Sequence, residues 1–207
     1  MLLAVKIKNG YLIAKDTLIY ELDELDNSSV ESNDGIFPSC DNFDYVIGGE
    51  GEYREVDFVK YLYGALPKKS IPLTASYLYN DFMPYVYNGL LKLHFIEEAK
   101  AFNFSTKFMV ARKNKAFLIN HATVQEIGNE EVVGYGEEVA IASLLLTQGK
   151  PGLYRVMHAF DRASKQSDRV GRNIIVADTS KKEVDYTIYY SEDIDEILNG
   201  TFVPNQE

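Results

Sequence analysis

The order of its apolar patterns constrains this 207-residue sequence more than any other feature. Alternating, strand-like patterns open the chain and a long helical block follows them. Strand patterns return over 107–133, a second pair of helical patterns covers 137–164, and further strands come after it. Strands joined by short turns form antiparallel sheets, and each helix must bury its apolar face on a sheet. The order therefore predicts an α+β protein, a four-layer αββα sandwich of two antiparallel sheets flanked by helix pairs.

The alternation of apolar and polar residues, together with the turn residues, predicts where the strands lie. The first hairpin is expected to turn at Asn9-Gly10, the strongest short hairpin signal. A second is expected to turn at Lys113-Asn114, with 124–133 continuing its sheet. The polar stretch 26–35 predicts an exposed loop, and Gly48-Gly49-Glu50-Gly51 predicts a tight turn from a strand into a helix. The remaining strands are expected at 17–20, 36–37, 45–47, 173–177 and 184–190.

Apolar periodicity predicts helices over 55–66, 73–99, 137–148, 153–160 and 191–198. Pro84 predicts a kink in the second, because proline removes a backbone donor and its ring crowds the preceding turn. The helix over 137–148 is apolar on every side, which is typical of a fully buried helix. Ser191 is the expected N-cap of the last helix. The length fits one domain over 1–207, with 191–207 as a C-terminal helix and tail.

Charge and composition argue against several classes of partner. The net charge of −10 disfavours binding to nucleic acid. Acids outnumber bases thirteen to one over 16–57, whereas 100–115 has five bases and no acid. These are two solvated surfaces or two faces that attract one another in self-association. The apolar runs are too short for a membrane span, and the first residues lack a secretory leader, so we expect a cytoplasmic protein with no membrane partner.

Metal, cofactor and disulfide sites are not expected. Cys40 is the only cysteine, and a lone cysteine is usually a small buried hydrophobe. His94, His121 and His158 are far apart in sequence and lack metal-ligand spacing. The glycine-rich segment lacks the Lys-Ser/Thr of a phosphate loop.

Three segments carry a family resemblance. The stretch Ala4–Asp16 resembles the opening hairpin of proteasome β-subunits and of the bacterial HslV peptidase. Val46–Gly51 looks like the fourth strand and glycine-rich turn of that family, and Phe117–Asp178 is similar to its back half. The resemblance covers about residues 2–65 and 104–190, and it implies the fold of the N-terminal nucleophile (Ntn) hydrolases.

The resemblance also implies a catalytic apparatus that this sequence lacks. Family members use an N-terminal Thr, Ser or Cys as nucleophile and its own α-amine as base. Aligning the opening hairpin places that nucleophile just before Met1, and the chain starts Met-Leu-Leu. The family's lysine falls near residue 35 or 36, where no lysine occurs, and its small serine is Tyr135 here. We therefore expect no catalytic residues.

The vestigial site candidates are Asp16, Asp168 and Tyr135. Asp16 stands at the position of the family's active-site aspartate, and Asp168 stands near that of a second one. A carboxylate at a strand end can also simply accept backbone N–H bonds. One carboxylate without a nucleophile does not make an active site.

Three functions remain open. The first is a catalytically inactive proteasome/HslV-like subunit that acts by self-assembly, as a homo-oligomer or ring, or as a scaffold or regulatory partner. The second is an active Ntn-type hydrolase or one with a relocated nucleophile, for which Asp16, Ser39 and Cys40 are candidates. The third is a peptide or small-molecule binding module that uses the vacant cleft near Met1, Asp16 and Tyr135. The tyrosines of the middle helices suit either subunit contacts or an aromatic core.

Overall fold

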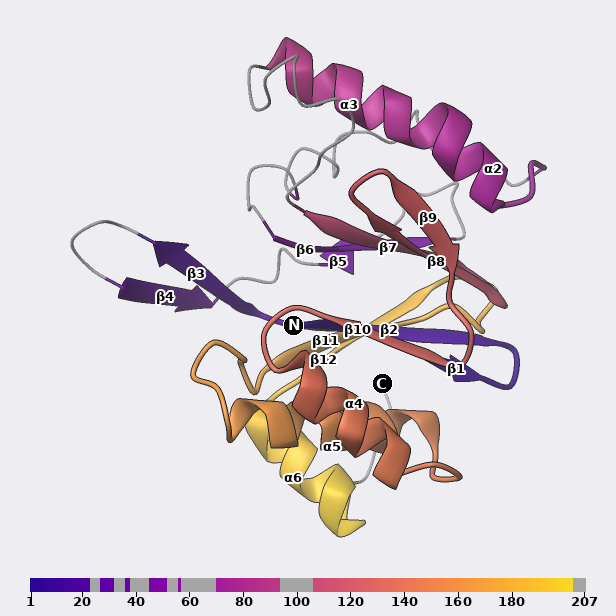
Figure 1. Ribbon diagram of the computed structural model, residues 1–207. Coiled ribbons are helices and arrows are strands. Elements are labelled where there is room, and N and C mark those ends of the chain that lie inside the picture. The colour runs from indigo at the N-terminus through magenta and orange to yellow at the C-terminus, as the bar shows by residue number, and fades with distance from the viewer. Residues whose placement is uncertain are drawn as a thin grey trace.

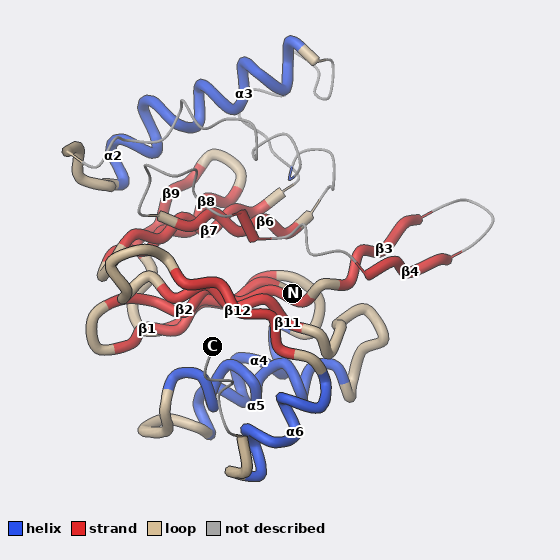
Figure 2. Tube along the Cα trace, turned by 180° about the vertical axis from the view of Figure 1, so that it is seen from behind, coloured by secondary structure: helices blue, strands red, loops and turns tan. Residues whose placement is uncertain are grey.

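Two antiparallel sheets lie face to face in the middle of the molecule, and helices cover both outer sides (Figure 1). Figure 2 shows the same layers from behind. The computed structural model describes residues 1–22, 27–31, 36–37, 45–51, 56, 70–93 and 106–202. The layering confirms the predicted α+β fold with an αββα sandwich at its centre.

Each main sheet is antiparallel throughout. The first has the order β10-β1-β2-β11-β12 and consists of β1 (Leu2–Ile7), β2 (Gly10–Asp16), β10 (Glu130–Val133), β11 (Ile174–Asp178) and β12 (Asp185–Tyr189). The second has the order β5-β6-β7-β8-β9 and consists of β5 (Ile36–Phe37), β6 (Val46–Glu50), β7 (Lys107–Arg112), β8 (Lys115–Asn120) and β9 (Thr123–Glu126). A separate ribbon of β3 (Leu18–Leu22) and β4 (Asn27–Glu31) extends sideways from the body (Figure 1).

The helices form two separate layers. The first sheet is covered by α4 (Glu137–Leu146), α5 (Gly152–Ser164) and α6 (Ser191–Asn199). The second is covered by one continuous helical stretch of α2 (Ala75–Tyr77), the π-helical turn η2 (Leu78–Phe82) and α3 (Met83–Lys92). The helix expected over 55–66 lies outside the described residues except for Val56, which is helical and buried.

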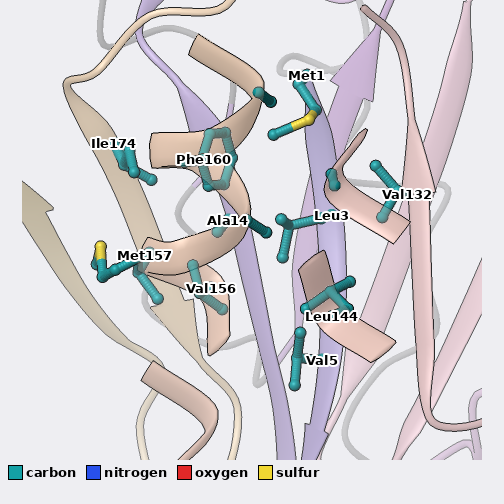
Figure 3. Close-up of a cluster of buried hydrophobic side chains, with 14 of the residues drawn as sticks. Met1, Leu3, Val5, Ala14, Val132, Leu144, Val156, Met157, Phe160 and Ile174 are labelled. Carbon is teal, nitrogen blue, oxygen red and sulfur yellow. The ribbon is translucent and has the colours of Figure 1, made fainter. Parts of the chain in front are cut away.

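Three apolar clusters hold the layers together. Strand β1 contributes to two of them, because its side chains alternate between the faces of the sheet. Leu3 and Val5 pack under α4 and α5, as Figure 3 shows, whereas Leu2 and Ala4 point toward the second sheet. The third cluster lies between the second sheet and α3 and includes Phe82 and Phe108. Burial on both faces explains why the central strands are nearly continuous apolar runs.

The structure corrects several expected boundaries among the strands. The segment 124–133 does not stay in one sheet: β9 belongs to the second sheet and β10 to the first. Residues 27–31, expected in a loop, form β4 and pair with β3. The sequence of β4, Asn-Ser-Ser-Val-Glu, is polar and lacks the apolar alternation on which the strand predictions were based. Gly48 and Gly49 are not a turn but lie within β6, where a Cβ on Gly48 would come 2.6 Å from Leu2 Cδ1.

The helix predictions need three corrections. Pro84 is preceded by the π-helical turn η2, the local irregularity that a missing donor and a crowded ring produce, and the helix continues beyond it. The N-cap of α6 is Tyr190 rather than Ser191, and the Asp193 carboxylate accepts its N–H at 2.8 Å. Helix α4 buries only Ala140, Ser143 and Leu144, because α5 and the sheet cover one side of it.

The first hairpin forms as predicted, but its two-residue loop is Lys8-Asn9, because Ile7 pairs with Gly10. Gly10 is needed for a different reason. A Cβ added there would lie 2.6 Å from the backbone nitrogen of Ser180, in the loop that follows β11. That loop is fixed in place, since the backbone N–H of Tyr11 donates to Thr179 Oγ1 at 2.9 Å.

We therefore expect Gly10→Ala to lower the free energy of unfolding by about 1–3 kcal/mol, the usual cost of overpacking. Urea denaturation measures the change. The control is Gly128→Ala, where a Cβ would meet nothing within 4 Å, and which should change stability by less than about 0.5 kcal/mol. Equal stability of the two variants would show that the Ser180 backbone can move to make room for the added Cβ at little cost in free energy.

Candidate functional site

The pairing of β1 with β2 places the start of the chain against Asp16. The two-residue loop fixes the register so that Leu2 pairs with Lys15. Met1 therefore comes opposite Asp16, whose backbone N–H points to the Met1 carbonyl at 3.4 Å. Successive residues of a strand face opposite ways, so Asp16 and Lys15 lie on different faces of the sheet.

Four charged groups meet at this end of the sandwich. The Met1 ammonium lies 2.9 Å from Asp16 Oδ2 and 3.3 Å from Glu50 Oε1. Lys15 Nζ lies 3.3 Å from Glu50 Oε2 and donates to the Gly49 carbonyl at 2.6 Å. Because Lys15 is on β2 and Glu50 is on β6, this cluster also joins the two sheets. We call Met1, Lys15, Asp16 and Glu50 the ionic cluster.

The Met1 side chain fills its surroundings. It is 2% exposed and belongs to the apolar cluster between the first sheet and the helices. Figure 3 shows it beside Phe160 of α5, at one end of that cluster. The space around the chain's first residue is therefore packed with apolar side chains on the helix side.

Burial and neighbouring charges shift the pKa values of Asp16 and Glu50 in opposite directions. Burial raises the pKa of Asp16, an effect that the Met1 ammonium opposes and the Glu50 charge reinforces. Burial also acts to raise the pKa of Glu50, but the ammonium groups of Met1 and Lys15 outweigh it and leave that pKa below its ordinary value. Glu50 is thus the carboxylate that holds a charge most firmly here.

Two glycines give the carboxylates room. Gly134 has a φ of 102°, and a Cβ there would overlap the Glu50 carboxylate. Gly171, in the loop before β11, also lies close to Asp16, since a Cβ added to it would be in van der Waals contact with Asp16 Cβ at 3.5 Å. Backbone from two separate parts of the chain therefore borders the ionic cluster.

Of the three vestigial candidates, only Asp16 belongs to the ionic cluster. Tyr135 is 50% exposed, and Arg169 Nη1 donates to its hydroxyl at 2.8 Å while the guanidinium lies 4.7 Å from the ring centroid. Asp168 is exposed in the same loop as Arg169. Among the described contacts, neither the Tyr135 hydroxyl nor the Asp168 carboxylate reaches the ionic cluster.

The sequence analysis missed Glu50 and Lys15. The resemblance puts the family's lysine near residue 35 or 36, where no lysine occurs, yet Lys15 brings an ammonium group to Glu50. Glu50 was assigned to a turn. A clue was present in Gly-Gly-Glu-Gly: glycines on both sides of one acid indicate close backbone approach around a buried carboxylate.

In the part of the chain that the structure describes, no other candidate residue joins the ionic cluster. Ser39, Cys40 and His94 lie outside the described residues. Ser164 donates to the Asp161 carbonyl at 3.1 Å within α5, and His121 is exposed in a turn. Among the described residues no group of three or more His, Cys, Asp or Glu side chains could hold a metal ion. None of the described helices is long and apolar enough to span a bilayer.

One serine and histidine pair was not foreseen. Ser143 Oγ on α4 lies 2.5 Å from His158 Nδ1 on α5. Burial lowers the pKa of His158, and the Arg162 charge adds to that effect. Ser143 is 2% exposed between the two helices, so a substrate carbonyl has no access to its hydroxyl. The pair is therefore a helix-to-helix contact rather than a nucleophile with its base.

Chemically, the cluster binds an amino terminus. It combines two ammonium groups and two carboxylates, and none of the four groups is a hydroxyl or thiol. Thr17 is the nearest hydroxyl in sequence to Asp16, and it is buried with its Oγ1 directed at the Asn173 carbonyl 3.4 Å away.

No family model matches the chain, and a comparison with curated proteins finds no match. Solved structures do match. The Anbu complex from Pseudomonas aeruginosa, described as a helical assembly, is 12% identical with a TM-score of 0.70 and covers 96% of this chain and 91% of its own.

Two further structures agree with it. BPH from Thiobacillus denitrificans, solved alone and with epoxomicin, is 15% identical with a TM-score of 0.64 and covers 91% of this chain and 97% of its own. HslV from Trypanosoma brucei is 14% identical with a TM-score of 0.56, and the match covers 90% of this chain and 97% of the HslV chain. The chain therefore has the proteasome/HslV-like Ntn-hydrolase fold.

Proposed function

We propose that this chain is a single-domain proteasome/HslV-like subunit without peptidase activity, which works in the cytoplasm by assembling with copies of itself or as a scaffold or regulatory partner. One observation carries the proposal: the Met1 amino group, which comes just after the position where the resemblance puts the family's nucleophile, is held by Asp16 and Glu50. The methionine side chain is a thioether, which does not attack a carbonyl. The two groups that hold the amino group are carboxylates rather than a hydroxyl or thiol that it could activate as a base.

Two further features support a role in assembly. Tyr79 and Tyr85, on the outer helices of the second sheet, are each about half exposed, and tyrosine is enriched at protein interfaces. The similar Anbu chain from Pseudomonas aeruginosa is described as forming a helical assembly.

The two alternatives receive no such support from the described residues. The Met1 side chain is buried among apolar neighbours, which argues against a vacant cleft on the helix side of the first residue. The candidate nucleophiles Ser39 and Cys40 lie outside the described residues. The Asp16 carboxylate accepts a hydrogen bond from the Met1 ammonium.

The first prediction concerns activity. We expect the purified full chain to retain Met1 by intact mass spectrometry, to hydrolyse no fluorogenic peptide, and to gain no mass from epoxomicin. An active proteasome-type peptidase assayed in parallel serves as the positive control. Peptide turnover that disappears on chemical modification of the N-terminus, or an epoxomicin adduct on residue 1, would contradict the proposal.

The second prediction concerns the ionic cluster as a structural element. The pKa of Glu50 is lowered in the folded protein, so its charge stabilises the fold above the ordinary pKa of 4.5 and this contribution is lost as the pH falls through the folded value. We expect Glu50→Gln to lower the free energy of unfolding at pH 7 by about 1–3 kcal/mol, because two buried ammonium groups lose a partner.

The difference between Glu50→Gln and the unmodified protein should shrink as the pH falls below 4.5 and through the lowered pKa of Glu50, because the carboxyl group of the unmodified protein then becomes neutral, like the amide of the variant. Urea denaturation at pH 7 and at pH 3.5 measures it. The control is Glu126→Gln, which removes an exposed ion pair with Lys115 and should cost less than about 0.5 kcal/mol at either pH. A loss of the same size at both pH values would show that the charge of Glu50 is not what stabilises the site.

A further inference from the structure

The Met1 nitrogen lies in a closed part of the molecule. Met1 is 2% exposed, and the hydrogen bond from its ammonium group to Asp16 Oδ2 is buried. Figure 3 shows the methionine side chain beside Phe160, within the apolar cluster between the first sheet and the helices. A charged group that is removed from water in this way is stable only with charged partners. The covalent state of this nitrogen therefore matters to the fold.

An ammonium group suits this position because of the number of its donors. Two carboxylate oxygens lie close to it, Asp16 Oδ2 at 2.9 Å and Glu50 Oε1 at 3.3 Å. An ammonium group has three N–H donors and can serve both. An acylated nitrogen is a neutral amide with a single N–H donor, so it loses its charge and cannot fully satisfy both carboxylates.

Acylation would also leave the ionic cluster with unequal charge. The free amine provides one of two ammonium groups, which face two carboxylates. Without the Met1 charge, Glu50 keeps Lys15 as a partner at 3.3 Å. Asp16 keeps none, because Met1 is its only partner among the ion pairs of the described residues. A buried carboxylate that loses its partner is strongly destabilising.

We propose that this fold requires a free Met1 amine, so that any acyl group attached to it must be removed by hydrolysis before the chain folds. In that reaction water adds to the acyl carbon and the C–N bond breaks. The acyl group leaves as a carboxylate, which is formate in the case of a formyl group. The nitrogen takes up the released proton and becomes the ammonium group. The chain is thus the substrate of an amide-hydrolysing reaction that precedes its folding.

This inference goes beyond the proposed function and does not depend on it. Peptide turnover by a chain with a free Met1 amine would overturn the proposed inactivity alone. A purified, folded chain that carries an acyl group on Met1 would overturn this inference alone.

The first test measures how well the fold shields the amine. The folded chain and the chain in urea are treated briefly with an amine-acetylating reagent, and peptide mass spectrometry measures the labelled fraction of Met1 and of the exposed Lys8. We expect folding to slow the labelling of Met1 at least about tenfold and to leave that of Lys8 unchanged, because a buried group reacts only when the structure opens. Equal rates at Met1 in the two states would contradict the proposal.

The second test compares the chain that has a free Met1 amine with a chain acetylated there by coexpression with an N-terminal acetyltransferase. Urea denaturation at pH 7 measures both. We expect acetylation to raise the equilibrium constant of unfolding about ten- to hundredfold, since Asp16 loses its partner. The control is Lys8→Gln, which removes an exposed ammonium group from the turn of the same hairpin and should change the constant less than about twofold.

The variant Asp16→Asn separates the loss of charge from the added size of the acetyl group. In the free chain it should raise the unfolding constant, because the ammonium group loses a carboxylate. In the acetylated chain it should lower that constant, or restore folding if the acetylated chain does not fold, because the unpaired carboxylate becomes a neutral amide. Asp168→Asn, which changes an exposed carboxylate, is the matched control and should affect neither form. Acetylation without effect on stability, or Asp16→Asn that destabilises both forms, would overturn the proposal.

Discussion

The end of the sandwich depends on a buried ammonium group that two carboxylates share. Charge taken out of water is stable only where an opposite charge and hydrogen bonds replace the solvent, and the Met1 amine has both Asp16 and Glu50. Glu50 in turn needs Lys15, which links the first sheet to the second. Loss of any one group would leave another charge buried without its partner, which costs far more than the pair contributes.

The opposite end of the same strands is held by neutral hydrogen bonds. Thr179 Oγ1 donates to the carbonyl of Lys113 at 2.8 Å and accepts the N–H of Tyr11, so the loop after β11 contacts the turns of both sheets. Between the two ends the layers meet through apolar side chains and through glycines that admit neighbouring atoms. Polar contacts at both ends and close packing between them together fix how the two sheets align.

The comparison with solved structures separates fold from function. Chains with 12–15% identity share the layering, and such likeness carries no catalytic residue with it. What this chain can do depends on its own groups. At the end of β1 and β2 the Met1 amino group is held by two carboxylates, and its side chain is buried among apolar neighbours.

Local periodicity was enough to predict the layers and the hairpins, because alternation and helical spacing are set by residues that are neighbours in sequence. It could not assign Gly48 and Gly49 to a strand, separate β9 from β10, or show that α4 is covered on one side only, since each depends on segments distant in sequence. The ionic cluster is the clearest case. Asp16 could be named from the sequence, but its partners Glu50 and Lys15 acquire meaning only when β6 lies against β2, and only the tertiary structure decides that.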